Sequence, residues 1–349
     1  MNDVGSGARE VFLMKKVSII VGAYNAHDTL ARCLTNLVHQ TLEDIEIIVV
    51  NDASKDDTWE IMQRCKEQFP EKVIIINNLE NLGSGGVRNL GLEAATGMYI
   101  GFCDSDDYCA SNMFELLYDK AIEKDADIVD CGFFAEAANK PSISTPDVAE
   151  GILDDEKRKL LILNGGYLWS KLFKRELFLD PPIKMRKHVR ALSDNDILKY
   201  MYLHAKDIWT VKEVLYYYSD APGSDTKVMD LDKYYESIYG VMEATYELCH
   251  NLPTYAAAKE VIEYAQIVWY SYGINRCIYD QIVKYGANEQ SIPKYFDNLS
   301  VEIEKKLMDL AQLKKRIITI DYDDNSEIGN RISDLDIKIM MECDRRFGQ

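Results

Sequence analysis

The first third of the chain alternates short apolar runs, rich in β-branched residues, with amphipathic stretches. The apolar runs predict strands buried on both faces, as in a parallel sheet. They lie at 17–21, 45–50, 73–76, 99–102 and 128–134. In the stretches 29–40 and 58–69, apolar residues recur at a spacing close to 3.6 and predict helices. This βαβ alternation predicts an open α/β sheet.

The pattern changes after residue 134. Residues 135–166 are rich in Ala, Asn, Pro and Ser around a charged helix predicted at 154–163, and we interpret them as an excursion over the sheet edge or a site. A further mixed unit ends in a strand predicted at 211–218, and from about residue 229 the pattern is mostly helical.

These changes predict how the chain is divided. We expect residues 1–14 to be a disordered leader and residues 15–225 to form one domain, with one half at 15–134 and the other at 135–225. Residues 226–349 are expected to form a helical C-terminal region. A chain of 349 residues with 47% hydrophobic content can bury a core of this size.

The strand predicted at 99–102 runs into three carboxylates within four residues, Asp104, Asp106 and Asp107. Two like charges about 4 Å apart repel by roughly 1 kcal/mol even in water, so a cation is needed to offset them. Oxygen ligands suit Mg²⁺ or Mn²⁺, and Mg²⁺ commonly combines one or two carboxylates with substrate phosphates. The cluster therefore predicts a metal–diphosphate site. A solvated turn that caps the next helix is the alternative interpretation.

Polar residues also follow the other predicted strands, where open α/β sheets bind their ligands. Ala23, Tyr24 and Asn25 follow the first strand, and Asp52 follows the second within a segment that a simple turn and helix cap would also explain. The glycine-rich segment 83–86 follows the third strand and is not a P-loop. We expect its glycines to let a helix N-terminus approach phosphate.

Charge and cysteine usage narrow the function classes. A formal net charge of −18 disfavours a general nucleic-acid binder, because phosphate contacts need Lys and Arg. The eight cysteines form no C-x-x-C pair, which favours a reducing cytosolic compartment. No stretch reaches the roughly 18 to 20 apolar residues that would span a bilayer.

Taken together, these motifs resemble the family 2 glycosyltransferases of the GT-A fold, a Rossmann-like, mostly parallel open sheet. The resemblance is close over 16–134 and looser to about 225, and it is carried by the segments 17–25, 40–56 and 81–91 together with the Asp cluster. One departure is Gly22-Ala23, where the family usually has Pro or Thr before the Tyr-Asn pair.

The resemblance implies a role for each donor-site residue. Tyr24 would lie near the nucleobase, Asp52 would accept the uracil N–H, and Asp104 would lie near the ribose or the metal. Asp106 would coordinate the metal that bridges the diphosphate, and Arg88 would organise the carboxylates or contact the donor. The remaining donor-site positions are Ala23, Asn25, Gly83 and Ser105.

Family members that invert the anomeric centre need a base for the acceptor hydroxyl, usually a Glu-Asp or Asp-Asp pair before a helix. Its counterpart here is the segment 193–198, in which the pair is altered to Asn195-Asp196. We predict Asp196 as the base, with Asp194 as the alternative. Asp194 could also simply cap the helix.

A further segment, 167–178, is similar to a Trp-x-Lys-Leu loop of the family. By this resemblance Trp169 would stack on a sugar face and Lys171 would approach phosphate. A buried Trp beside a surface Lys explains the same pattern. The tyrosines at 216–218, together with Gly223 and Ser224, resemble a strand and loop that close over the donor.

The resemblance implies an inverting, Mn²⁺- or Mg²⁺-dependent transferase that moves a sugar from a UDP-sugar to a glycan or lipid-linked acceptor in bacterial surface-polysaccharide synthesis. It implies a cytoplasmic location. Two further expectations stay open, peripheral contact with the inner membrane face and self-association through the C-terminal helices. One rival is a sugar-nucleotide nucleotidyltransferase, which would carry a basic glycine-rich loop after the first strand. The other is a non-catalytic nucleotide-sugar or glycan-binding protein, disfavoured by intact Asp104, Asp106 and Asp196.

Overall fold

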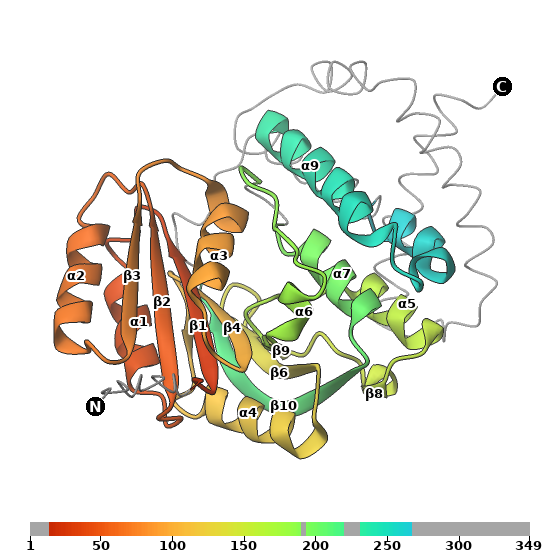
Figure 1. The fold of residues 1–349 in the computed structure, drawn as a ribbon, viewed down its shortest axis with the longest axis horizontal. Coiled ribbons are helices and arrows are strands. Elements are labelled where there is room, and N and C mark those ends of the chain that lie inside the picture. Colours follow the sequence, from red (N-terminus) through yellow and green to blue (C-terminus); the bar gives the residue numbers. More distant parts are fainter. Residues whose placement is uncertain (1–13, 190–192, 220–230, 267–349) are drawn as a thin grey trace, which may run out of the picture.

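The computed structural model describes residues 14–189, 193–219 and 231–266. Within these residues the strands form one ten-stranded mixed sheet with the main order β3-β2-β1-β4-β9-β6-β10-β5, flanked by helices on both faces (Figure 1). This architecture confirms the predicted α/β class.

The longer strands are parallel to their neighbours, apart from one inserted strand. The parallel strands are β1 (Val17–Ala23), β2 (Ile45–Asp52), β3 (Val73–Asn78), β4 (Tyr99–Asp104), β6 (Ile128–Ala135) and β10 (Asp207–Tyr218). The inserted strand is β9 (Lys171–Lys174), which pairs antiparallel with both β4 and β6. The short strands are β5 (Tyr108–Cys109), β7 (Lys140–Ser142) and β8 (Gly151–Ile152).

Two apolar cores cover the two faces of the sheet, because successive residues of a strand point to opposite sides. Ile19 and Ile47 belong to one core, which contains α1 (Leu30–Val38), α2 (Thr58–Gln68) and α4 (Met113–Lys124). Ile20 and Ile48 belong to the other. Its helices are α3 (Gly83–Ala94), α5 (Asp155–Asn164), α6 (Glu176–Leu179), α7 (Asn195–His204) and α9 (Leu231–Cys249). A short 3₁₀ turn, η1, spans Asp147–Ala149.

The predicted strands are all present, and each extends one or more residues beyond its apolar run. The sequence pattern did not reveal β9, whose four residues are too few for a periodic signal. In the predicted C-terminal region, α9 and residues 255–266 are helical. Residues 267–349, most of the expected leader and the expected closing residues Gly223 and Ser224 lie outside the described residues. No helix in the described ranges has the length and apolar content needed to cross a bilayer.

Candidate active site

The loops after β1 and β2 are tied to each other at the C-terminal edge of the sheet. The Asn25 N–H donates to the Ser54 hydroxyl at 3.0 Å, and the Lys55 N–H donates to Asn25 Oδ1 at 2.8 Å. Asn25 has a φ of 50°, a left-handed conformation that Asn tolerates better than most residues. Beside it, the Tyr24 side chain is 46% exposed and available to a flat ligand.

Asp52, at the end of β2, is buried and caps α3. Its two carboxylate oxygens accept the N–H groups of Leu82 at 2.8 Å and Gly83 at 2.9 Å. A Cβ on Gly85 would lie 2.1 Å from the Arg186 carbonyl oxygen, so the chain itself covers this end of α3. The expectation that these glycines admit a phosphate is therefore not supported, because a protein carboxylate already occupies the first N–H groups. Contact between Asp52 and uracil stays a prediction.

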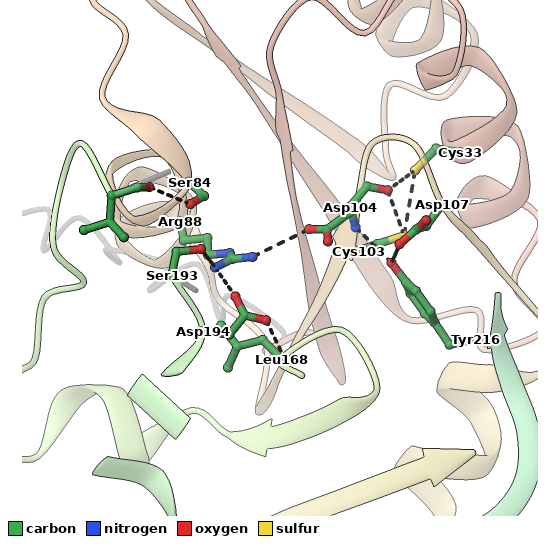
Figure 2. Close-up of polar contacts among 11 residues, drawn as sticks. Cys33, Ser84, Arg88, Cys103, Asp104, Asp107, Leu168, Ser193, Asp194 and Tyr216 are labelled. Atoms are coloured by element: carbon green, nitrogen blue, oxygen red, sulfur yellow. Dashed lines mark hydrogen bonds and ion pairs between the residues drawn. The ribbon is translucent and has the colours of Figure 1, made fainter. Parts of the chain in front are cut away.

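The loop after β4 carries the three clustered carboxylates and is fixed to β10. Asp107 is fully buried and accepts the Tyr216 hydroxyl at 2.7 Å and the Ser219 N–H at 2.8 Å. The same Tyr216 oxygen accepts the N–H of Asp104 at 3.1 Å, as Figure 2 shows. The Asp104 side chain, by contrast, is 39% exposed. Asp107 thus anchors the loop, and Asp104 remains open to a ligand.

Arg32 of α1 also contacts the loop after β4, which the sequence pattern did not predict. Its guanidinium donates to the Asp106 carbonyl oxygen at 2.6 Å and to the Ser219 hydroxyl at 2.8 Å. It also lies over the ring of Tyr108, 4.8 Å from the centroid. A single Arg on an amphipathic helix gives no sequence signal for such a contact, because the partner is a backbone oxygen far along the chain.

Arg88 of α3 connects the two halves of the domain. Its Nη1 donates to Asp194 Oδ1 at 2.7 Å and to Ser193 Oγ at 3.2 Å, and its Nη2 lies 3.6 Å from Asp104 Oδ1 (Figure 2). The residue is 7% exposed, and its guanidinium lies 5.8 Å from the centroid of the Phe102 ring. A buried cation therefore holds one carboxylate from each half, Asp104 and Asp194.

The carboxyl groups of the site raise one another's pKa values. Burial, together with the charges of Asp194 and Asp106, raises the pKa of Asp104 to about 7, against the opposing effect of Arg88. Burial and the charges of Asp104 and Asp106 raise the pKa of Asp107 to about 9. Clustered oxygen ligands of this kind suit Mg²⁺ or Mn²⁺.

No group of three or more His, Cys, Asp and Glu side chains within the described residues is arranged to hold a metal ion. A metal held by Asp106 and Asp104 together with substrate phosphates therefore stays a prediction. Asp106 and Asp104 are the carboxylates that the loop supplies. None of these contacts tests whether Ser105 lies in a donor site, so that role stays a prediction.

The two candidate bases have different surroundings. Asp194 lies at the start of α7, where its Oδ1 contacts Arg88 and its Oδ2 accepts the Leu168 N–H at 3.1 Å. Asp196 is 2% exposed, and its Oδ1 accepts the N–H of Ile197 at 2.7 Å. Burial raises the pKa of Asp196 to about 6 and lowers that of nearby Lys199 to about 8. The structure therefore brings Asp194 to Asp104, whereas Asp196 is enclosed.

Trp169 and Lys171 do not line an open site, and the expected contacts with sugar and phosphate are not supported. Trp169 is 3% exposed and stacks on Tyr167 and Tyr216, with centroids 4.4 Å and 4.3 Å away. Lys171 is fully buried, and its Nζ lies 3.1 Å from Asp130 Oδ1. Both side chains stabilise the acceptor half instead of meeting a ligand directly.

Comparison with known proteins agrees with this geometry. Residues 18–185 match the model of the family "Glycosyl transferase family 2". The glycosyltransferase EpsJ of Bacillus subtilis is 31% identical over 223 residues, which cover 61% of this chain and 63% of EpsJ. WfaP of Escherichia coli, a UDP-Glc:α-D-GlcNAc-diphosphoundecaprenol β-1,3-glucosyltransferase, is 44% identical over 95 residues, 27% of this chain and 37% of WfaP. The chain thus spans less than two thirds of either relative.

Solved structures resemble the whole fold at low sequence identity. A Staphylococcus aureus TarS fragment in complex with UDP-GlcNAc has a TM-score of 0.65 and 19% identity, covering 96% of this chain and 92% of that one. The mannosyltransferase PcManGT of Pyrobaculum calidifontis, in complex with GDP-Man and Mn²⁺, has a TM-score of 0.55 and 14% identity, covering 95% and 88%. Residues 18–185, which lie within the GT-A-type sheet, thus match a glycosyltransferase family 2 domain.

Proposed function

We propose that this protein is an inverting, metal-dependent glycosyltransferase that moves a sugar from a UDP-sugar to a hydroxyl of a glycan or lipid-linked acceptor in bacterial surface-polysaccharide synthesis. One observation carries the proposal. Arg88 contacts Asp104 at the end of the donor strand and Asp194 at the start of α7, so that a donor-site carboxylate and a base candidate flank one buried cation.

The UDP-sugar donor is supported by two relatives and by the exposed polar groups at the sheet edge. WfaP is named for UDP-Glc, and the TarS fragment is in complex with UDP-GlcNAc. In this chain the exposed ring of Tyr24 offers a surface for the base. Asp52 Oδ1 accepts both the Leu82 N–H and, at 3.4 Å, Asn78 Nδ2, so that Oδ2, which accepts the Gly83 N–H, is the oxygen with a further lone pair for the uracil N–H.

Asp106 and Asp104 would hold the metal. When bound, Mg²⁺ or Mn²⁺ would offset the charge of the diphosphate as it leaves. The protein's own part is to keep the loop in place, since Tyr216 and Ser219 fix Asp107 from β10 and the residue that follows it. The Mn²⁺ in the PcManGT complex supports a divalent ion in this fold.

We assign the base to Asp194 and keep Asp196, the residue predicted from the sequence, as the alternative. As the acceptor oxygen attacks the anomeric carbon on the side opposite the diphosphate, its proton would pass to the Asp194 carboxylate. Arg88 orients that carboxylate through Oδ1, and the Leu168 N–H orients it through Oδ2. Asp196 lacks comparable access, because it is 2% exposed.

The proposal includes a cytoplasmic location with peripheral contact at the inner membrane face. WfaP is named for a diphosphoundecaprenol-linked acceptor, and a long apolar chain of that kind favours a bilayer over water. The cysteines within the described residues are all free thiols, as in a reducing compartment. Self-association through the C-terminal helices remains part of the proposal as well.

The test is release of UDP from UDP-glucose and UDP-GlcNAc, measured with Mn²⁺ and then with excess EDTA. We expect turnover with the metal, loss with EDTA, and loss in Asp106→Asn. Asp119→Asn, which changes an exposed carboxylate on α4, is the matched control and should behave as the parent. Calorimetric binding of UDP-sugar without any UDP release would indicate a non-catalytic binding protein. Formation of pyrophosphate from UTP and a sugar phosphate would indicate the nucleotidyltransferase.

A further inference from the structure

Three aromatic rings form a continuous stack in the acceptor half. The ring centroids of Tyr216 and Trp169 are 4.3 Å apart and those of Trp169 and Tyr167 are 4.4 Å apart, with interplanar angles of 13° in both pairs. Exposure increases along the stack, from 0% at Tyr216 and 3% at Trp169 to 39% at Tyr167. Tyr167 is therefore the end of the stack that a ligand can reach.

One end of this stack contacts the loop after β4, and the other end lies next to the residue that contacts the proposed base, Asp194. The Tyr216 hydroxyl contacts Asp107 and the Asp104 N–H in the metal-binding loop. At the other end, Tyr167 directly precedes Leu168, whose N–H donates to Asp194 Oδ2 at 3.1 Å. The exposed ring thus belongs to the residue next to the one that contacts the proposed base.

The backbone of Tyr167 is held in place by buried polar groups of the acceptor half. Its carbonyl oxygen accepts a hydrogen bond from Lys171 Nζ at 3.2 Å, and it lies 3.4 Å from Ser170 Oγ, whose hydroxyl donates to Asp130 at 2.7 Å. Gly166 has a φ of 136°, and a Cβ there would lie 3.0 Å from Lys171 Nζ, so only glycine fits before Tyr167. The buried Lys171 therefore acts on the site by holding the loop that presents Tyr167.

The ring itself is also held in one orientation. Trp169 covers it by stacking, and Phe133 meets it edge to face, with centroids 5.4 Å apart and an angle of 78°. A fixed aromatic ring offers a large contact area at a small cost in conformational entropy. A sugar ring presents a face of C–H groups that packs well on such a surface.

We infer that Tyr167 is the platform on which the acceptor sugar stacks, which sets the attacking hydroxyl toward Asp194. This inference rests on the proposed function and adds to it a residue that determines acceptor specificity. Trp169 supports the platform from within the protein. Tyr167 acts by binding and orienting the acceptor and takes no part in proton transfer.

The experiment compares Tyr167→Ala, Tyr167→Leu and Tyr167→Phe with the parent, using UDP-glucose as donor and methyl glycosides of glucose, galactose and N-acetylglucosamine as acceptors. Transfer to the glycoside and hydrolysis of the donor by water are measured separately. We expect the Ala and Leu variants to raise the acceptor KM roughly tenfold, the loss expected for one aromatic contact, while hydrolysis and the donor KM are unchanged. Tyr167→Phe should keep the acceptor KM, because it keeps the ring.

Tyr246→Ala is the matched control. Tyr246, on α9, is also exposed, and its ring stacks on that of His250, which directly follows the helix. An unchanged acceptor KM in the Ala and Leu variants would overturn the inference. So would a parallel rise in the donor KM and fall in hydrolysis, which would place the ring against the donor sugar. A parent protein that neither hydrolyses UDP-sugars nor transfers to any glycoside contradicts the proposed function itself. Thermal melts of all variants separate these outcomes from unfolding.

Discussion

Two buried carboxylates of the domain, Asp52 and Asp130, are stabilised in different ways. In the nucleotide half, Asp52 is held by backbone N–H groups at the start of α3. Asp130 of β6 is held mainly by side chains that come from the acceptor half, those of Lys171, Ser170 and Thr145, together with the Thr145 N–H. Backbone groups are present whatever the local sequence, whereas a side-chain cluster fails when one member is replaced. Substitutions around Asp130 are therefore expected to cost more than substitutions around Asp52.

The largest effect should appear where the two halves meet, at Asp194. Asp194→Asn removes the carboxylate that Arg88 presents to the site, and we expect kcat to fall by about 10² to 10⁴-fold, the usual contribution of a general base. UDP-sugar affinity should stay close to that of the parent, because the donor contacts lie at the strand ends. Steady-state kinetics and calorimetry measure the two quantities.

Asp196→Asn is the matched control for that variant, two residues along the same helix and enclosed. It should retain most of the parental kcat. The opposite result, a large loss in Asp196→Asn with Asp194→Asn nearly unaffected, would return the base to the residue predicted from the sequence.

A direct test of how Asp130 and Asp52 are held compares the free energies of unfolding of Lys171→Met and Asp52→Asn in urea. Lys171→Met leaves the Asp130 charge buried without its cation, so we expect a loss of about 3–5 kcal/mol. Asp52→Asn keeps one oxygen for a backbone N–H, and we expect a loss of only about 1 kcal/mol. Equal losses in the two variants would contradict the distinction.

A smaller effect is expected from the buried pair in α7, Asp196 and Lys199. Replacing both, as Asp196→Asn with Lys199→Met, removes two desolvated charges together, and such replacements are neutral or stabilise by about 1–4 kcal/mol. We expect a gain in the free energy of unfolding at pH 7. A loss at that pH would mean that the pair's attraction exceeds its cost of burial.

The pH dependence of the same pair gives a second readout. The pKa of Asp196 is about 6 in the folded protein and about 4 when unfolded, so its contribution to stability is present below pH 4 and lost as pH rises through 6. The pKa of Lys199 is about 8 when folded and about 10.4 when unfolded, so its contribution is lost as pH falls through 8. The advantage of the double variant should therefore be greatest between pH 6 and pH 8.

A similar contrast decides what the sequence could predict. Polar residues that directly follow long apolar strands, such as Asp52 and Asp104, lie where the pattern placed them, because parallel strands share one carboxyl edge. The burial of Trp169 and Lys171 could not be read from the sequence, because their partners, the ring of Tyr216 and the carboxylate of Asp130, are far along the chain. Arg32 and Tyr167 were missed as site residues because their importance depends on contacts, to a backbone oxygen and to stacked rings, that no local motif encodes.

The insertion of β9 also limits how the domain can move. Its backbone pairs with β4, which leads to the loop that carries Asp106 and Asp107, and with β6, which neighbours β10. Swinging one half away from the other about a hinge would break one of these hydrogen-bond ladders, which is a far larger cost than repacking a loop. Substrate entry and product departure should therefore rely on rearranged loops above a sheet that stays continuous.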